Sequence, residues 1–334
     1  MRGLADRVHR LAQGVLSGDR LATARAITML ENNHPGAREL MERLAAHVGR
    51  AYRVGVTGPP GAGKSTLVDA LAREARSRGD TVGVIAVDPS SPFSGGALLG
   101  DRVRMSRALE DPQVFVRSMA ARGSLGGLAR TAQEAMDVLD AFGKSLLLLE
   151  TVGVGQSELA VAAACDLTVV VLVPEAGGVV QAMKAGLMEI ADIFVVNKAD
   201  RPGAEEMQQS LREAAQFLER NGWLPPVHRV VALDSRGVPE LFDCLSDHRR
   251  WLQEGDRLEK KRLEQSAQRI RELVRAGLEE RLWRDPSIRS TLDLYALRLQ
   301  SGELGLYGAA VEVWNQIRER LAATRLESAW EDAP

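Results

Sequence analysis

The chain has 334 residues, of which 45% are hydrophobic and 26% are charged, and its formal net charge is −2. This length and apolar content are enough for a sizeable core in one large domain or two, which excludes a disordered protein. The balanced charge predicts no strong non-specific attraction to nucleic acid or to an anionic membrane.

Two further features narrow the class of protein. The only cysteines, Cys165 and Cys244, lie far apart and lack metal-ligand spacing, so we expect reduced core side chains in a cytoplasmic protein. The N-terminus MRGLADRVHR has no long apolar segment, so we expect no signal peptide. No apolar run is long enough for a transmembrane helix.

The first 47 residues are predicted to be helical. Leu4, Val8, Leu11 and Val15 recur at the spacing of one helix face. Turn-forming residues then separate a second helix, at about 20–32, from a third at about 35–48. This segment carries no catalytic cluster, so we interpret it as a helical packing module.

From residue 48 to 246, apolar strands alternate with helical segments. Runs such as LLLL and VVVLV lack a two-residue alternation, which is typical of strands buried on both faces of a mostly parallel sheet. We therefore predict an α/β fold of three layers, α/β/α, with ligands beyond the carboxyl ends of the strands. The expected strands are Arg53–Thr57, Val82–Val87, Val114–Arg117, Leu146–Glu150, Leu167–Val173, Ile193–Asn197 and Val227–Val231.

Residues 247–334 have a different character. Spaced apolar residues within charged sequence predict a long helix, and a continuous helix over 248–283 would extend roughly 54 Å. Two more helices are expected at about 287–300 and 308–328. We interpret this part as a helical arm used for self-association, with a lid folded on the preceding domain as the alternative.

Residues 54–66 read VGVTGPPGAGKST and fit the spacing of a P-loop, G-x-x-x-x-G-K-[ST]. Glycines allow the backbone to aim several N–H groups at a phosphate, and the helix that follows adds positive partial charge. Lys64 is predicted to reach the β- and γ-phosphates and the Ser65 hydroxyl to bind Mg²⁺. The nucleotide-binding residues expected here are Gly58, Pro59, Pro60, Gly61, Ala62, Gly63, Lys64, Ser65 and Thr66.

Guanine specificity is predicted from the segment IFVVNKAD, which ends in Asn197, Lys198 and Asp200. A carboxylate at Asp200 can accept hydrogen bonds from N1–H and the exocyclic amine of guanine, a donor pair that adenine lacks. The next strand ends near Ala232 and Leu233, where a backbone contact to the guanine oxygen is expected.

Acidic residues at strand ends predict a magnesium site, because Mg²⁺ prefers hard oxygen ligands near the phosphates. The candidate ligands, through direct or water-mediated contacts, are Ser65, Asp88, Asp101 and Glu150. Since Mg²⁺ keeps several waters, not all of them are expected to be direct ligands.

Five segments together resemble the MeaB/ArgK group of P-loop GTPases: VTGPPGAGKST, VIAVDPSSPFSGGALLGDRVRM, RGSLGG, ETVGVGQSE and VVNKAD. The resemblance covers about residues 15–245 and, more loosely, the tail. It implies a homodimeric GTPase that binds GTP or GDP with Mg²⁺ and escorts an adenosylcobalamin-dependent acyl-CoA mutase, chiefly methylmalonyl-CoA mutase. Such proteins gate cofactor loading and protect the mutase; an older label for the group is a lysine/arginine/ornithine transport-system kinase or ATPase.

The resemblance also implies three switch segments. The first corresponds to about Asp88–Arg104, the second to Gly153–Glu158 and the third to about Val173–Lys184. Within them, the functional positions expected are Gly153, Gln156, Glu158, Gln181 and Lys184. Gly178 stands where the group commonly has an acidic residue, and Val231 stands where it has a small hydroxyl residue.

Catalysis of GTP hydrolysis depends mainly on positioning and charge, for which Lys64 and Mg²⁺ are the expected sources. Gln156 is a candidate for orienting the attacking water, or else a loop residue that contacts a partner. Arg104 either approaches the phosphates or pairs with Asp101. We therefore expect hydrolysis to be slow for the chain alone and faster with a partner.

Two other functions compete with a mutase chaperone. A metal-insertion GTPase would need clustered Cys and His ligands near the switches, and the five histidines do not cluster in sequence. A kinase would need an acceptor pocket and a base, for which the sequence gives no clear signal.

Overall fold

A computed structural model describes residues 2–88, 110–120, 125–151, 163–174 and 186–323. Its contacts divide the chain into two compact units, Met1–Lys261 and Arg262–Pro334. The finer domain boundaries expected at residues 47 and 246 stay a prediction.

A seven-stranded sheet forms the centre of the first unit. All neighbouring strands are parallel, and their order is β3-β2-β4-β1-β5-β6-β7. All seven predicted strands are present; the strand at 193–197 has the predicted bounds, and each of the others differs at one end by one to three residues. The strands are β1 (Tyr52–Thr57), β2 (Val82–Asp88), β3 (Val114–Ala120), β4 (Leu146–Thr151), β5 (Leu167–Leu172), β6 (Ile193–Asn197) and β7 (Val227–Val230).

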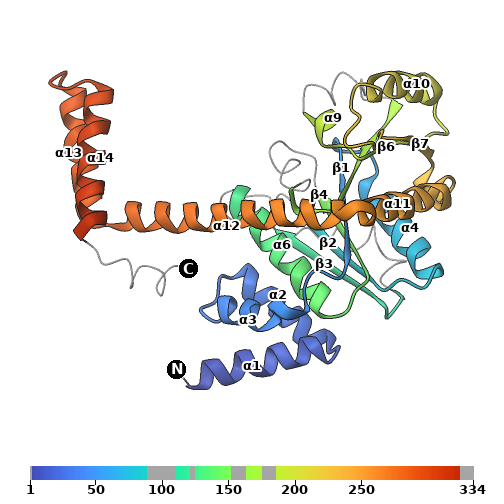
Figure 1. Cartoon of the computed structure of the whole chain (residues 1–334), viewed down its shortest axis with the longest axis horizontal. Helices are drawn as coiled ribbons and strands as arrows, with labels where there is room; N and C mark the ends of the chain where they lie inside the picture. The colour runs from blue at the N-terminus through green and yellow to red at the C-terminus, as the bar shows by residue number, and fades with distance from the viewer. Residues whose placement is uncertain (1, 89–109, 121–124, 152–162, 175–185, 324–334) are drawn as a thin grey trace. The chain divides into compact units, whose positions relative to one another are not determined.

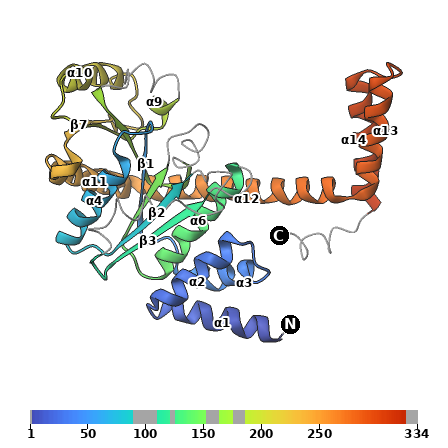
Figure 2. The ribbon, with the colours of Figure 1, turned by 180° about the vertical axis from the view of Figure 1, so that it is seen from behind.

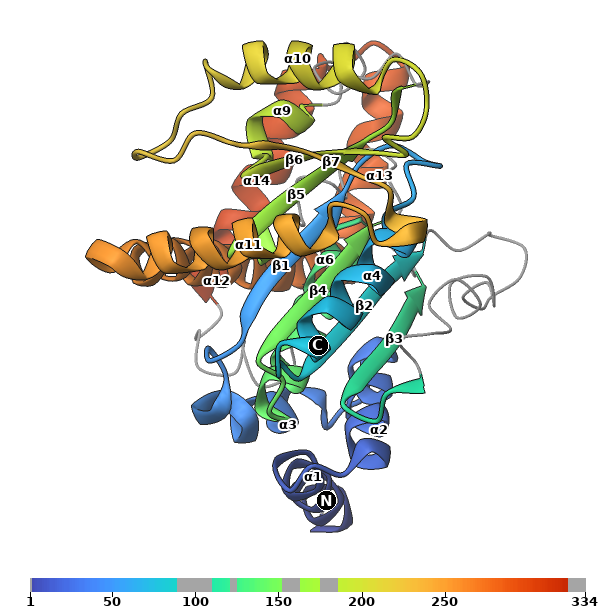
Figure 3. The same cartoon turned by 90° about the vertical axis from the view of Figure 1, so that its right-hand side faces the viewer.

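Helices cover both faces of the sheet, which confirms the three-layer α/β/α prediction. One face packs on α4 (Lys64–Ser77) and α11 (Val238–Gln253), and the other packs on α6 (Leu125–Ala141) and α10 (Ala204–Ala215). Figure 3 shows α4 and α11 in front of the strands and α6 behind them. Two short elements flank β6 and β7: α9 (Leu187–Ile190) precedes β6, and the 3-10 turn η4 (Ala232–Asp234) follows β7.

Burial on both faces explains the unbroken apolar runs. In β4, Leu146 and Leu148 pack into the core beneath α4, while Leu147 and Leu149 pack into the core beneath α6. Every side chain of β4 and β5 is buried, so neither strand has a solvent face that would require polar residues.

The N-terminal helices belong to the first unit. They are α1 (Arg2–Leu16), α2 (Arg20–Glu31) and α3 (Ala37–Leu44), followed by the 3-10 turn η1 (Ala45–His47). Figure 2 shows α2 beside α6, with which it shares one hydrophobic core. The N-terminal helices are also tied to the start of β3 by Arg20. Its guanidinium donates to the carbonyls of Pro112 and Val114, 2.6 and 3.0 Å away.

The long helix expected over 248–283 is broken near its start. Helix α11 ends at Gln253, Gly255 takes a left-handed conformation with φ 64°, and α12 begins at Arg257. The Arg257 guanidinium donates to the carbonyls of Trp251 and Glu254, 3.0 and 2.8 Å away, and so satisfies acceptors that a continuous helix would use. The single sequence signal for this break is Gly255.

The second unit is helical and small. Helix α12 (Arg257–Arg284) leads into α13 (Pro286–Gln300) and α14 (Leu306–Ala323), which lie side by side (Figure 1). Ile288, Val313 and Ile317 form their buried core. No described helix is long and apolar enough to cross a lipid bilayer.

A buried histidine lies at the amino end of the sheet. His248 on α11 is 1% exposed, its Nδ1 lies 2.9 Å from the Tyr52 hydroxyl, and its ring contacts Trp223 and Trp251. Burial raises the pKa of Tyr52, so the phenol keeps its proton and can donate to Nδ1. Burial lowers the pKa of His248 from 6.5 to about 4, because its charged form would lose its hydration.

We expect His248 to make the protein less stable in mild acid. The unfolded chain binds a proton at this histidine below pH 6.5, whereas the folded chain does so only near pH 4. The free energy of unfolding should therefore be unaffected by His248 above pH 6.5 and fall by up to about 3 kcal/mol between there and pH 4. Urea unfolding of the wild type and of the non-titrating His248→Gln variant would measure this effect. It would be contradicted if the free energy of unfolding changed equally with pH in the two proteins.

Candidate nucleotide-binding site

The P-loop joins the carboxyl end of β1 to the start of α4. Gly58, Gly61 and Gly63 all have positive φ, at 141°, 77° and 83°, which is the backbone that only glycine adopts freely. Helix α4 begins at Lys64, directly after the loop, so its unpaired N–H groups and the positive end of its dipole face the site. This geometry is suited to a polyphosphate.

Gly58 has the closest backbone approach in the loop. A Cβ at this position would lie 2.1 Å from the carbonyl oxygen of Val171 in β5. We expect Gly58→Ala to lower the free energy of unfolding by about 3 kcal/mol or more, because the clash is with backbone.

Gly79→Ala is the matched control for this prediction. Gly79 also has positive φ, at 94°, but nothing lies within 4 Å of its added Cβ, so only about 1 kcal/mol of backbone strain is expected. Denaturant unfolding of both variants would separate the cost of the clash with Val171 from the cost of backbone strain. Equal losses in the free energy of unfolding would contradict the role of Val171.

The reactive side chains of the loop are held in place. Lys64 is 6% exposed, and its ammonium donates to the carbonyls of Gly58 and Pro59, 2.8 and 3.0 Å away. The Ser65 hydroxyl donates to the Glu150 carboxylate at the end of β4, 2.6 Å away. Since that proton points at Glu150, the lone pairs of the Ser65 oxygen stay available to a cation.

The residues present fit a hard cation such as Mg²⁺. Ser65 and Glu150 bring a hydroxyl and a buried carboxylate together beside the phosphate loop, which are the oxygen donors that this ion takes. Among the described residues, no group of three His, Cys, Asp or Glu could by itself hold a metal. Asp88 is the last residue of β2, two strands from β1, and its side chain lies outside the described structure.

Asn197 links the phosphate loop to the neighbouring loops. Its side chain is 3% exposed; the amide nitrogen donates to the Ala62 carbonyl, 2.8 Å away, and the amide oxygen accepts from the Ala232 N–H, 3.1 Å away. A Cβ on Gly63 would lie 2.4 Å from the same amide nitrogen. The structure thus places Asn197 beneath the loops, where it holds three of them in register.

A cavity of about 270 Å³ lies between the P-loop and the ends of β6 and β7. Asp200 and Lys198 line it, and Lys198 has a left-handed backbone with φ 55°. Thr66 and Gly63 line it from the P-loop side. The structure thus brings together the predicted phosphate and guanine residues; the other lining residues are Asn197, Arg201, Val231, Ala232, Leu233 and Asp234.

Arg201 and Asp234 were not among the predicted site residues. Each follows a predicted guanine contact by one residue, which is the sequence signal that could have included them. Val231, the departure noted above, lines the same cavity, and its N–H donates to the Arg236 carbonyl, 2.9 Å away.

Several predicted positions fall outside the described residues, so their roles stay predictions. They comprise the other metal candidate, the two further catalytic candidates and the switch residues: Asp101, Arg104, Gly153, Gln156, Glu158, Gly178, Gln181 and Lys184.

The parallel sheet, the loop around Lys64 and the adjoining cavity define a P-loop nucleotide-binding protein. Comparison with known proteins narrows this class. Residues 23–287 match the family described as "Methylmalonyl Co-A mutase-associated GTPase MeaB". The chain is 50% identical over 271 residues to a candidate GTPase of Pyrococcus abyssi, covering 80% of this chain and 84% of that protein.

Two more comparisons point to the same family. The chain is 37% identical over 280 residues to GTPase ArgK of Escherichia coli, covering 80% of this chain and 82% of that protein. It superposes on the crystal structure of a LAO/AO transport system kinase with a TM-score of 0.74 and 27% identity, covering 93% and 97% of the two chains. The chain therefore belongs to the MeaB/ArgK family and is a GTPase.

Proposed function

We propose that this GTPase is a chaperone of an adenosylcobalamin-dependent acyl-CoA mutase of the methylmalonyl-CoA mutase type. In this role it gates loading of the cofactor and protects the mutase from inactivation. The observation that carries the proposal is the match of residues 23–287 to a family whose description names association with that mutase.

The arrangement of the site supports nucleotide-dependent control. Lys64 and the start of α4 would bind the phosphates, and Asp200 would accept the guanine N–H groups. Ser65 and Glu150, with Asp88 and Asp101, would hold Mg²⁺, which neutralises charge on the phosphates when bound. Gln156 and Arg104 are the proposed additional catalytic groups.

Self-association of the chain is also proposed. The second unit buries only a small core and exposes large apolar side chains, of which Tyr307 is 87% and Trp314 59% exposed. We take these exposed apolar side chains as the surface that a second copy of the chain would cover. Light scattering of the full chain would test for the expected homodimer, and a monomer at micromolar concentration would contradict it.

The cytoplasm is the proposed location. Cys165 is buried and Cys244 is partly buried, and the two form no disulfide. Both thiols agree with a reducing compartment.

The decisive experiment measures phosphate release from GTP and Mg²⁺, with and without a purified acyl-CoA mutase, together with capture of that mutase. We expect slow release by the GTPase alone, faster release with the mutase, and a nucleotide-dependent complex. The chaperone role would be contradicted if the rate of phosphate release were the same with and without the mutase and the mutase were not captured. Phosphate release without any acceptor would count against a kinase.

A further inference from the structure

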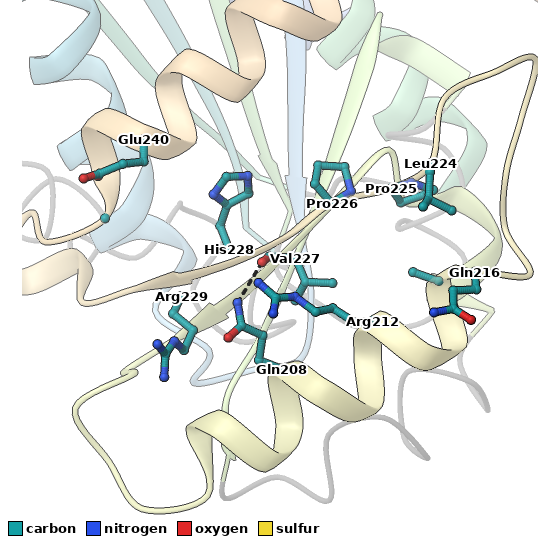
Figure 4. A pocket seen from close by; sticks show the side chains of 12 residues that line it. Gln208, Arg212, Gln216, Leu224, Pro225, Pro226, Val227, His228, Arg229 and Glu240 are labelled. Atoms are coloured by element: carbon teal, nitrogen blue, oxygen red, sulfur yellow. Dashed lines mark hydrogen bonds between the residues drawn. The ribbon is translucent and has the colours of Figure 1, made fainter.

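A second pocket lies on the flank of the sheet, beside its edge strand β7. Its volume is about 710 Å³, within the range of pockets that bind small organic molecules. Helix α10 forms one wall, the start of α11 another, and the segment 224–226 leads into β7 between them (Figure 4). No lining residue is shared with the cavity beside the P-loop.

The edge of β7 is closed to an added strand. The carbonyl of Val227 accepts from Gln208 Nε2 on α10, 2.9 Å away. The carbonyl of Arg229 faces Gly237, where an added Cβ would lie only 2.3 Å from that oxygen. Since both outward carbonyls are covered, an added strand would find neither of these acceptors free, and the space suits a compact ligand better.

The polar side of the pocket carries excess positive charge. Arg212 lies one turn after Gln208 on α10, and it forms no ion pair or hydrogen bond with the described residues. Figure 4 shows its guanidinium pointing from α10 toward β7. The pKa of His228 on β7 is lowered mainly by burial and to a smaller degree by the charge of Arg212. The carboxylate of Glu240 on α11 opposes this shift.

The remaining charged group at the pocket is Arg229. Its guanidinium lies 4.0 Å from Glu205, and both side chains are well exposed, so this contact neutralises little of its charge. With His228 neutral, the two arginines outweigh the single carboxylate of Glu240 among the lining residues.

The end of the pocket formed by the segment 224–226 is largely apolar and stiff. Pro225 and Pro226 have fixed backbone φ, and Leu224, 50% exposed, stands beside them. Gln216 on α10 is the polar side chain at this end, beside Leu224 (Figure 4). A ligand that filled the pocket would contact an apolar surface at one end and a planar guanidinium at the other.

From this geometry we infer that the β7 pocket is a second ligand site, which binds a small organic anion with an apolar body. Arg212 holds the carboxylate or phosphate through paired N–H donors, and Leu224, Pro225 and Pro226 pack on the body. The site lies apart from the nucleotide and does not depend on the identity of the protein partner.

Isothermal titration calorimetry of the full chain, saturated with GDP and Mg²⁺, tests the inference. The probes are phenyl phosphate and benzoate, which distinguish phosphate from carboxylate, and the uncharged benzyl alcohol. We expect saturable binding of at least one anion at one site per chain and much weaker binding of benzyl alcohol. No saturable binding of either anion, or equal binding of benzyl alcohol, would overturn the inference.

Matched variants locate the bound anion. Arg212→Gln should weaken binding by at least about tenfold, because a charged, paired hydrogen bond is lost. Arg220→Gln removes the same charge from an exposed side chain outside the pocket and should leave binding unchanged. Leu224→Glu should also weaken binding by repulsion. Binding that survives Arg212→Gln and Leu224→Glu undiminished would exclude this pocket.

Discussion

Replacing Asp200 by asparagine is expected to weaken GDP binding by about 10²- to 10³-fold, equivalent to roughly 3–4 kcal/mol. Asp200 lines the cavity beside the P-loop, where its carboxylate can accept both guanine N–H groups. An asparagine amide presents one donor and one acceptor, so one guanine N–H group would face the NH₂ donor of the amide. Xanthine has an oxygen in place of the exocyclic amine, so the variant should bind xanthosine diphosphate better than the wild type does.

Calorimetric titration with GDP, xanthosine diphosphate and ADP measures this change in specificity. Asp234→Asn is the matched control, because Asp234 lines the same cavity and the substitution removes the same charge. Asp234 is paired with Arg236, 3.3 Å away, on an exposed surface, so a small effect is expected. If both substitutions reduced GDP affinity equally, general electrostatics rather than base recognition would explain the result.

Lys64→Met should lower kcat/KM for GTP by at least about 10³-fold, equivalent to roughly 4 kcal/mol of transition-state stabilisation. The side chain keeps its length but loses the charge that lies inside the phosphate loop. The substitution also removes a donor from the carbonyls of Gly58 and Pro59, so the loop is expected to become less ordered.

Single-turnover hydrolysis, with thermal unfolding measured in parallel, tests this prediction. Lys260→Met, at an exposed position on α12, is the control for loss of one lysine charge. A well-folded Lys64→Met protein with less than tenfold loss of activity would show that Lys64 does not act on the phosphates.

Much of the site could be predicted because it is encoded in short, contiguous segments. Glycines at 58, 61 and 63 favour the left-handed backbone of the loop locally, and Lys64 and Ser65 follow by spacing alone. The seven strands could also be predicted, since continuous apolar runs are typical of strands with two buried faces. The break before α12 was missed, because one glycine within a helical pattern does not by itself end a helix.

The sequence by itself determined the class of fold, the phosphate loop and the acid expected to read the base, because these follow from local backbone preference and residue spacing. The tertiary structure decided what depends on chain segments far apart. Asn197 bridges Ala62 and Ala232, Ser65 meets Glu150, and the β7 pocket assembles from α10, β7 and α11. No local pattern specifies these contacts, since the strand order that creates them is set by packing between distant segments.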